Sequence, residues 1–312
     1  MSYLKIKELE LNKKTSTVVL LQSVEESETK SGRPYCRLTL SDGESTIVAN
    51  LWDTEKAKLK VEEKTLISAE LYPKMYQENV SYELYRYGKA PEDAKIEEFI
   101  IHAPYKSDAM YDEILAIMKK EGGDSSLVTL VETIYEENKE KLLYWSAAKC
   151  VHHNMYGGLL YHTFRMVRAG CMLARVYPSI KKDVLIAGIA LHDIGKLEEL
   201  ETDALGIAEY SVDGSLFTHA YLGMRMVEEA GKRLGTDKEL IRQVMHVIAA
   251  HHGQLEWGAI SLPQTAEAMM VHEIDMIDSR MEQFEKNYQD MEPGTMSKKI
   301  FGLGMSIYKP LQ

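Results

Sequence analysis

Seven histidine and aspartate side chains in the second half of the chain could together hold metal ions. They are His162, His192, Asp193, His219, His251, His252 and Asp275. Taken as five groups along the chain, they stand 24 to 32 residues apart, each on a separate predicted helix. Several helices of a bundle can each direct one ligand at a common centre. The spacing therefore predicts a metal site built between helices.

The ligand types indicate which ions would bind and what they would do. Imidazole and carboxylate together suit Mn, Fe, Co, Ni or Zn, whereas Mg and Ca prefer oxygen ligands. Six or seven ligands suit two ions that share a carboxylate, and Asp193 is the predicted bridge. Two such ions activate a water and clamp phosphoryl oxygens. Lys196, one helical turn beyond Asp193, could reach a phosphate oxygen, so both residues are predicted to be catalytic.

A structural explanation competes with this one. A single histidine in an apolar helix is more often a hydrogen-bonded core residue than a ligand, and one His-Asp dipeptide is weak support. The order of all five groups favours a metal site. If only His162, His192, Asp193 and Asp275 bind, the site holds one ion and not two.

The elements that position these residues fall into two regions. Residues 15–22, 35–40, 45–52, 66–72 and 80–87 are rich in β-branched and aromatic residues and predict five short strands. Five strands in some ninety residues predict a small barrel, of which the OB-fold is the commonest type. Residues 94–101, 109–120 and 126–143 show helical spacing, and the chain remains helical to about Phe284. We expect a multidomain α+β protein with a β-barrel, a helical connector and an all-α domain.

Composition limits the classes of protein that the chain can be. The net charge of −11 falls wholly outside residues 1–90, which hold 14 basic and 14 acidic residues. This acidity does not favour a protein that coats duplex nucleic acid, but bound metal ions can reverse the local field. No apolar stretch is long enough to span a membrane, and no secretory signal is recognisable. Three dispersed cysteines favour a reducing compartment, so we expect a cytoplasmic protein.

The motifs around the predicted ligands resemble the HD superfamily of metal-dependent phosphohydrolases. The resemblance rests on residues 158–163 (GLLYHT), 191–196 (LHDIGK) and 272–275 (HEID). His219 and the His251-His252 pair resemble the HD-GYP branch of phosphodiesterases. The Gly-Tyr-Pro of that branch is replaced by residues 253–258 (GQLEWG), which does not favour hydrolysis of cyclic-di-GMP.

A second resemblance covers almost the whole chain. Residues 152–160 (HHNMYGGLL), 250–253 (AHHG), 263–268 (PQTAEA) and 272–280 (HEIDMIDSR) are similar to the YhaM family of bacterial 3′–5′ exoribonucleases. The resemblance implies release of nucleoside monophosphates from single-stranded RNA, some activity on single-stranded DNA, and two divalent ions, with Mn²⁺ favoured. It also implies an OB-fold domain joined to an HD domain. Together with the change of patterning along the chain, this predicts an OB-fold domain for nucleic acid at 1–90, a helical connector at 91–145, an HD domain at 146–290, and a tail at 291–312 packed on that domain.

Five further residues are candidates for substrate binding. Tyr35 and Arg37 are expected on the outer face of the barrel, where aromatic side chains of OB-folds stack on bases. Trp52 is a candidate for the same role; the alternative is that Trp52 packs inside the barrel and Tyr35 is an ordinary strand residue. His153 and Asn154 precede the His162 helix and could line the substrate path, although Asn154 could simply cap that helix. The sequence leaves the oligomeric state open, and a homo-oligomer is one of the alternatives.

Two other functions remain alternatives. The first is a phosphodiesterase of cyclic or small dinucleotides. The second is a catalytically inactive regulator that binds nucleic acid.

Overall fold

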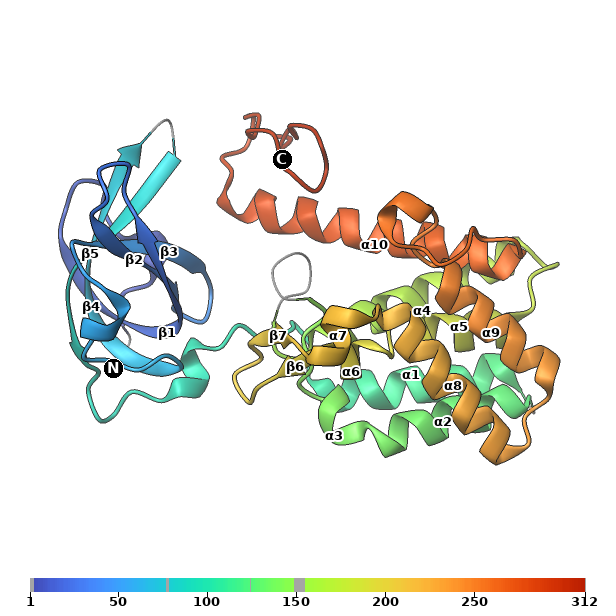
Figure 1. The fold of residues 1–312 in the computed structure, drawn as a ribbon. Coiled ribbons are helices and arrows are strands. Elements are labelled where there is room, and N and C mark those ends of the chain that lie inside the picture. The colour runs from blue at the N-terminus through green and yellow to red at the C-terminus, as the bar shows by residue number, and fades with distance from the viewer. Residues whose placement is uncertain (1–2, 77–78, 124, 149–154, 312) are drawn as a thin grey trace. The chain divides into compact units, whose positions relative to one another are not determined.

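The computed structural model describes residues 3–76, 79–123, 125–148 and 155–311 (Figure 1). The chain divides into two units, Met1–His102 and Ala103–Gln312. The first unit consists mainly of strands and the second mainly of helices. The expected combination of a small barrel with a mainly helical region is confirmed.

Five strands of the first unit close into a barrel in the order β1-β2-β3-β5-β4. They are β1 (Thr15–Glu28), β2 (Pro34–Ser41), β3 (Thr46–Trp52), β4 (Thr65–Tyr76) and β5 (Asn79–Lys89). Alternating residues fill the interior, as on β2, where Cys36, Leu38 and Leu40 are fully buried. β1 extends beyond the predicted 15–22 because its first half pairs with β4 and its second half with β2.

The segment that leaves the barrel differs from its prediction. Helical spacing over 94–101 predicted a helix, but only a 3₁₀ turn forms there, Ile96–Phe99. Its Phe99 is buried, and the Phe99 carbonyl accepts a hydrogen bond of 3.0 Å from the Ser41 hydroxyl. Gly43 also packs against the backbone of Glu98, where a Cβ atom would lie 2.2 Å from the carbonyl oxygen. These contacts hold the segment against the barrel, so tertiary packing overrides the local helical pattern.

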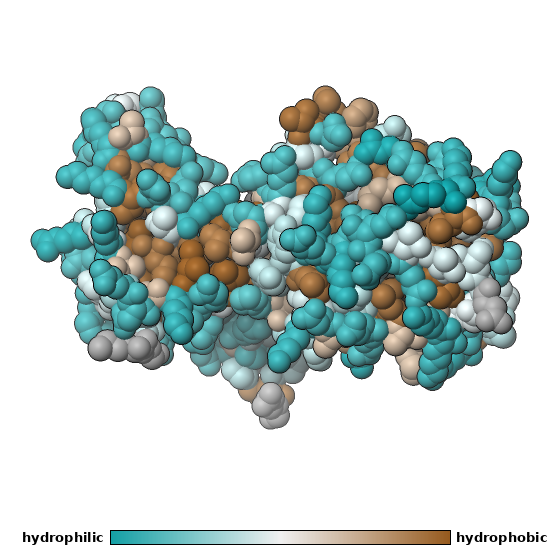
Figure 2. All heavy atoms as spheres, turned by 90° about the horizontal axis from the view of Figure 1, so that it is seen from below, coloured by the Kyte–Doolittle hydropathy of each residue, from teal (hydrophilic) through white to brown (hydrophobic). Residues whose placement is uncertain are grey.

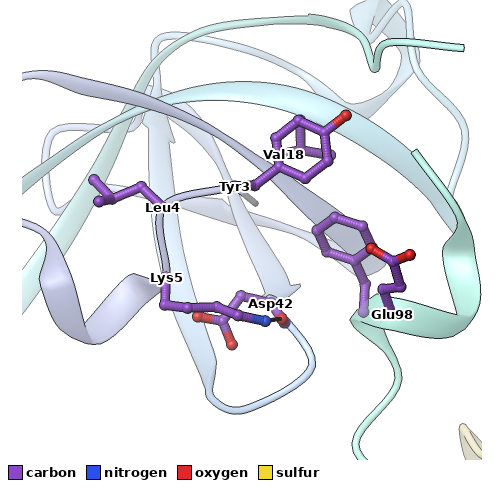
Figure 3. Close-up of a pocket in the computed structure, with 7 residues that line it drawn as sticks. Tyr3, Leu4, Lys5, Val18, Asp42 and Glu98 are labelled. Carbon is purple, nitrogen blue, oxygen red and sulfur yellow. Dashed lines mark hydrogen bonds between the residues drawn. The ribbon is translucent and has the colours of Figure 1, made fainter. Parts of the chain in front are cut away.

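A small pocket of about 70 Å³ lies beside this segment and is lined by the residues labelled in Figure 3 together with Phe99, which the figure also draws. The Lys5 ammonium donates to the Asp42 carbonyl at 2.6 Å, and the Ile6 amide donates to the Asp42 carboxylate at 2.5 Å. The Asp42 carboxylate also accepts from the amides of Glu44 and Ser45. The polar groups of the pocket therefore fasten the start of the chain to the β2–β3 turn.

The second unit is a bundle of helices with one short hairpin. Its helices are α1 (Ser107–Gly122), α2 (Ser126–Glu137), α3 (Lys139–Leu142), α4 (Gly158–Val176), α5 (Lys182–Leu191), α6 (Lys196–Glu199), α7 (Val212–Leu216), α8 (His219–Leu234), α9 (Lys238–Ala250) and α10 (Ala266–Asp290). The hairpin pairs β6 (Leu200–Thr202) with β7 (Ala208–Tyr210) and was not indicated by the sequence. The predicted helix over 126–143 is interrupted at Asn138, which separates α2 from α3.

Helix α5 lies at the centre of this bundle, and every residue from Val184 to Leu191 is buried. Helices α1, α2, α4, α9 and α10 pack around it. Helices α1 and α2, which the sequence placed in a connector, thus contribute directly to the helical core. After α10 the chain turns back in an irregular hairpin, and the Lys309 ammonium donates to the carbonyls of Tyr288 and Met291.

The surface is mixed in character. On the face in Figure 2, hydrophobic residues gather over the barrel unit, whereas the helical unit presents mostly hydrophilic groups between smaller hydrophobic patches. Across the described part of the chain, none of the helices has both the length and the apolar character needed to cross a membrane.

Candidate metal centre

Five helices bring the seven predicted ligands together. His162 lies in α4 and Asp275 in α10, while His219 is the first residue of α8. The pairs His192-Asp193 and His251-His252 follow the last residues of α5 and α9. Gly195 lets the turn after α5 approach α8, because a Cβ atom there would lie 2.0 Å from the His219 carbonyl oxygen. The glycine is therefore needed to bring these two ligand-bearing segments together.

The ligands form two groups of three. One group is His162, His192 and Asp275, and the other is His219, His251 and His252. Within each group the potential ligand atoms all lie within 4.8 Å of one another, which is close enough to surround a single ion.

Asp193 stands between the two groups. Its Oδ2 lies 3.3 Å from Nε2 of His192 and 3.8 Å from Nε2 of His162. Its Oδ1 lies 3.4 Å from Nε2 of His219 and 3.7 Å from Nε2 of His251. One carboxylate oxygen thus faces each group, which is the geometry that a bridging ligand requires.

Four imidazoles are oriented through their Nδ1 atoms. His192 and His251 each bond the carbonyl three residues earlier, Ile189 at 2.8 Å and Ile248 at 2.7 Å. The other two bond carboxylates: His162 with Asp278 at 2.8 Å, and His219 with Glu199 at 2.9 Å. With Nδ1 engaged, each ring turns Nε2 towards the cluster and offers it as a ligand.

The charge states of the buried groups also suit metal ions. Burial tends to raise the pKa of Asp193, but Lys196 and His192 hold it well below its usual range. Burial and the neighbouring His252 keep the pKa of His251 well below its ordinary value. Burial alone would lower the pKa of His192, but the Asp193 carboxylate outweighs it and leaves the pKa raised. A metal ion takes an ionised carboxylate and neutral imidazoles, so its binding would release any proton held at His192.

The residues present therefore fit a pair of divalent ions. In addition, Nδ1 of His252 is buried and has no hydrogen-bond partner among the described residues. A buried polar atom without a partner is costly in a folded protein unless it meets an ion or a water. A nitrogen that serves as a metal ligand would have no hydrogen-bond partner in the protein, as Nδ1 of His252 has none among the described residues.

The Lys196 side chain points into the same cluster. Its ammonium lies 2.7 Å from Oδ2 of Asp193, and the residue is buried. Burial tends to lower the pKa of Lys196, but the Asp193 charge outweighs it and leaves the pKa raised, so the group is a cation. It supplies fixed positive charge beside the bridging carboxylate.

Three supporting residues lie beside the ligands. Asp278 is buried against His162. Glu199 holds His219, and nothing in the spacing of 20 residues between them indicates this contact. His272 donates from Nδ1 to the His251 carbonyl at 2.8 Å and so fixes the backbone between two ligands.

On the barrel, the three candidate residues for nucleic acid lie on the outer face, so Trp52 does not pack in the interior. The rings of Tyr35 and Trp52 stand 4.8 Å apart on adjacent strands. The Trp52 indole donates to the Glu83 carboxylate at 2.8 Å, and Lys74 pairs with the same carboxylate. Arg37 lies 3.3 Å from Glu25 and is exposed. The result is a fixed aromatic surface with cations at its edge.

The remaining candidates, His153 and Asn154, lie outside the described residues.

Comparisons with known proteins agree with this geometry. The HD domain family matches residues 159–280, the stretch that carries all seven ligands. The 3′-5′ exoribonuclease YhaM of Oceanobacillus iheyensis is 30% identical over 304 residues, covering 94% of this chain and 92% of that protein. The YhaM protein of Bacillus subtilis is 27% identical over 305 residues and 96% of each chain.

Among solved structures, the barrel matches the second OB-fold domain of replication protein A from Methanococcus maripaludis. The match covers 30% of this chain and 98% of that domain, at 21% identity and a TM-score of 0.24. Such a score establishes no shared fold, so the description of the barrel rests on its strand order.

Proposed function

Because the chain belongs to the YhaM family of 3′-5′ exoribonucleases, we propose that it is a metal-dependent enzyme that removes nucleotides from the 3′ end of single-stranded RNA. The observation that carries this proposal is the position of Asp193, with one oxygen towards each three-ligand group. Two sites joined by a carboxylate are suited to phosphodiester hydrolysis. Activity on single-stranded DNA belongs to the same proposal.

The ligand residues would be His162, His192 and Asp275 at one site and His219, His251 and His252 at the other. Two bound ions would supply an activated water and a clamp for the phosphoryl oxygens. The mixture of imidazole and carboxylate suits Mn²⁺ as well as Fe, Co, Ni or Zn, and we propose Mn²⁺.

The chain itself contributes positive charge and orientation. Lys196 is a buried cation, and as the phosphate enters it can offset charge that develops on a non-bridging oxygen. Glu199 and Asp278 hold the rings of His219 and His162 at fixed angles. Preorganised groups of this kind need no rearrangement when the substrate arrives.

The barrel supplies a surface suited to a single strand. Tyr35 and Trp52 present neighbouring rings, and such rings bind bases with little regard for sequence. Arg37 can contact the phosphate backbone. The barrel segment is electrically neutral, so affinity would depend on engaging the strand together with the catalytic site. We place this activity in the cytoplasm, where RNA and reduced thiols are both present.

The test is incubation of the protein with Mn²⁺ and a 5′-labelled single-stranded RNA, with products resolved on a gel. We expect a ladder that shortens from the 3′ end, is suppressed by a chelator, and is absent in His192→Ala and Asp193→Asn. Glu273→Gln, which changes an exposed carboxylate on α10, is the matched control and should retain activity.

Two outcomes would contradict the proposal. Hydrolysis of a cyclic dinucleotide with RNA left intact would support a small-nucleotide phosphodiesterase. Binding of RNA without any hydrolysis, in several metals, would support a regulator.

A further inference from the structure

The metal centre has a more open side. His162, His192, Asp193, His219 and His251 are at most 7% exposed. His252 and Asp275, one from each three-ligand group, are the less buried members. A phosphodiester that reaches both groups must therefore approach past these two side chains.

A loop that follows α9 borders His252 and the helix that carries Asp275. Gly258 lies against His252, since a Cβ atom at Gly258 would stand 3.3 Å from Nδ1 of that ring. The preceding Trp257 has its ring centre 6.2 Å from that of His272. His272 and Asp275 are three residues apart on α10 and so share one face of that helix. Trp257 thus stands beside the open side of the centre.

The loop is held by backbone hydrogen bonds. The Trp257 amide donates to Gln254 at 3.1 Å, and the Ile260 amide donates to Ala249 at 2.8 Å. Gly253 begins the loop at φ +77°, and a Cβ atom there would lie 2.2 Å from His272. The backbone around Trp257 is therefore fixed against the helices that carry the ligands.

On this fixed loop the Trp257 side chain is 52% exposed. Single exposed apolar residues are common on protein surfaces. This one differs because it is a large flat ring on a fixed backbone, next to the less buried side of the centre. A ring carried on a fixed backbone can stack on a base at less cost in conformational freedom than one carried on a mobile loop.

We propose that Trp257 stacks on the base of the 3′-terminal nucleotide, the one that is released. This inference rests on the proposed exonuclease function. Upstream nucleotides are positioned by their phosphates, but the terminal nucleotide has no phosphate beyond the scissile one. Its base is the largest remaining group by which the protein can hold it, and stacking accepts every base.

The test compares two RNAs that differ only in the 3′-terminal nucleotide, one normal and one abasic. Stacking on one base contributes about 1–3 kcal/mol, equivalent to about 5- to 150-fold in affinity. We therefore expect the full-length wild-type protein to show kcat/KM lower by at least about fivefold on the abasic substrate. In Trp257→Leu the two substrates should become nearly equal, and Trp257→Phe should recover most of the difference.

Tyr177→Leu is the matched control, because Tyr177 is also 52% exposed but follows the last residue of α4, fifteen residues from His162. It should preserve the wild-type ratio between the two substrates. An unchanged ratio in Trp257→Leu would overturn the inference while leaving RNA shortening, and hence the proposed function, intact. The inference would also be overturned if wild-type kcat/KM falls when the penultimate nucleotide is abasic but not when the terminal nucleotide is abasic. If wild-type protein does not shorten RNA, the proposed function fails first and this inference fails with it.

Discussion

The orientation of His162 depends on a single carboxylate that is not itself a ligand. Asp278 is buried, and its Oδ2 bonds Nδ1 of His162 at 2.8 Å. Its Oδ1 lies 2.6 Å from Nε of Arg165. Two N–H donors thus converge on two carboxylate oxygens. We predict that Asp278→Asn weakens metal binding although it changes only one atom.

The magnitude follows from the donors. Asparagine offers one oxygen, so its NH₂ group must face either Arg165 or His162. If the NH₂ group faces Arg165, two N–H donors point at each other with no acceptor between them, and this costs about 1–3 kcal/mol of stability. Facing His162, it requires Nδ1 to accept, which moves the ring proton to Nε2 and removes the ligand atom. Loss of a partner that orients a ligand typically lowers metal affinity by about 10- to 100-fold, and we expect a value in that range.

The assay is equilibrium binding of Mn²⁺ to chelator-treated protein, followed by RNA hydrolysis at increasing Mn²⁺. Asp278→Asn should bind more weakly and recover activity at higher metal concentration. Glu273→Gln, on the exposed face of the same helix, should match wild type in both measurements. An affinity for Mn²⁺ within about twofold of wild type would refute the reasoning, since the orienting contact would then make no difference to the ligand.

Three further predictions concern separate parts of the chain. Gly253→Ala should lower the free energy of unfolding by about 2 kcal/mol or more in urea titrations, because φ is +77° and the new Cβ would meet His272. Gly235→Ala, at φ +71° with open space around it, should cost less and separates backbone strain from the clash. Lys196→Met should lower kcat by about 100-fold in single-turnover assays while Mn²⁺ binding persists, because it removes a charge that acts on the phosphate. Burial raises the pKa of the Cys171 thiol to about 11, so its alkylation should be slow at pH 8 and accelerate only as the pH approaches that value. Mass spectrometry of the peptide that contains Cys171 measures the rate.

Six of the seven members of the candidate centre were predictable because each occurs in a short motif. His192 and Asp193 are adjacent, as are His251 and His252, and each pair follows a helix that ends in apolar residues. Since helices of a bundle converge, ligands at similar positions on successive helices meet at one place. The sequence could not show how the ligands divide into two groups of three. That division depends on which helices are neighbours in space.

The supporting residues were harder to predict for a physical reason. Asp278 and Glu199 act across distances of 116 and 20 residues along the chain, through contacts that exist only after the bundle has formed. Glu83 is similar, because it accepts from Trp52 across two strands that pair in parallel only in the closed barrel. A single carboxylate in a strand or helix has no spacing that distinguishes such a role from an exposed position.

The ends of two helices explain why histidine follows α5 and α9. The last carbonyls of a helix lack partners within it, and His192 and His251 each donate Nδ1–H to one of them, three residues earlier. The same bond satisfies the carbonyl, selects the tautomer and turns Nε2 outwards. It also places each ring at the negative end of a helix dipole, which favours cations. Both helices end in apolar residues that are buried. The partial negative charge at each helix end therefore lies in surroundings of low polarity, where it attracts a cation more strongly than it would in water. A helix whose buried last turn is followed by a histidine and then by a second ligand is therefore already half of a cation site, and α5 and α9 are two such helices.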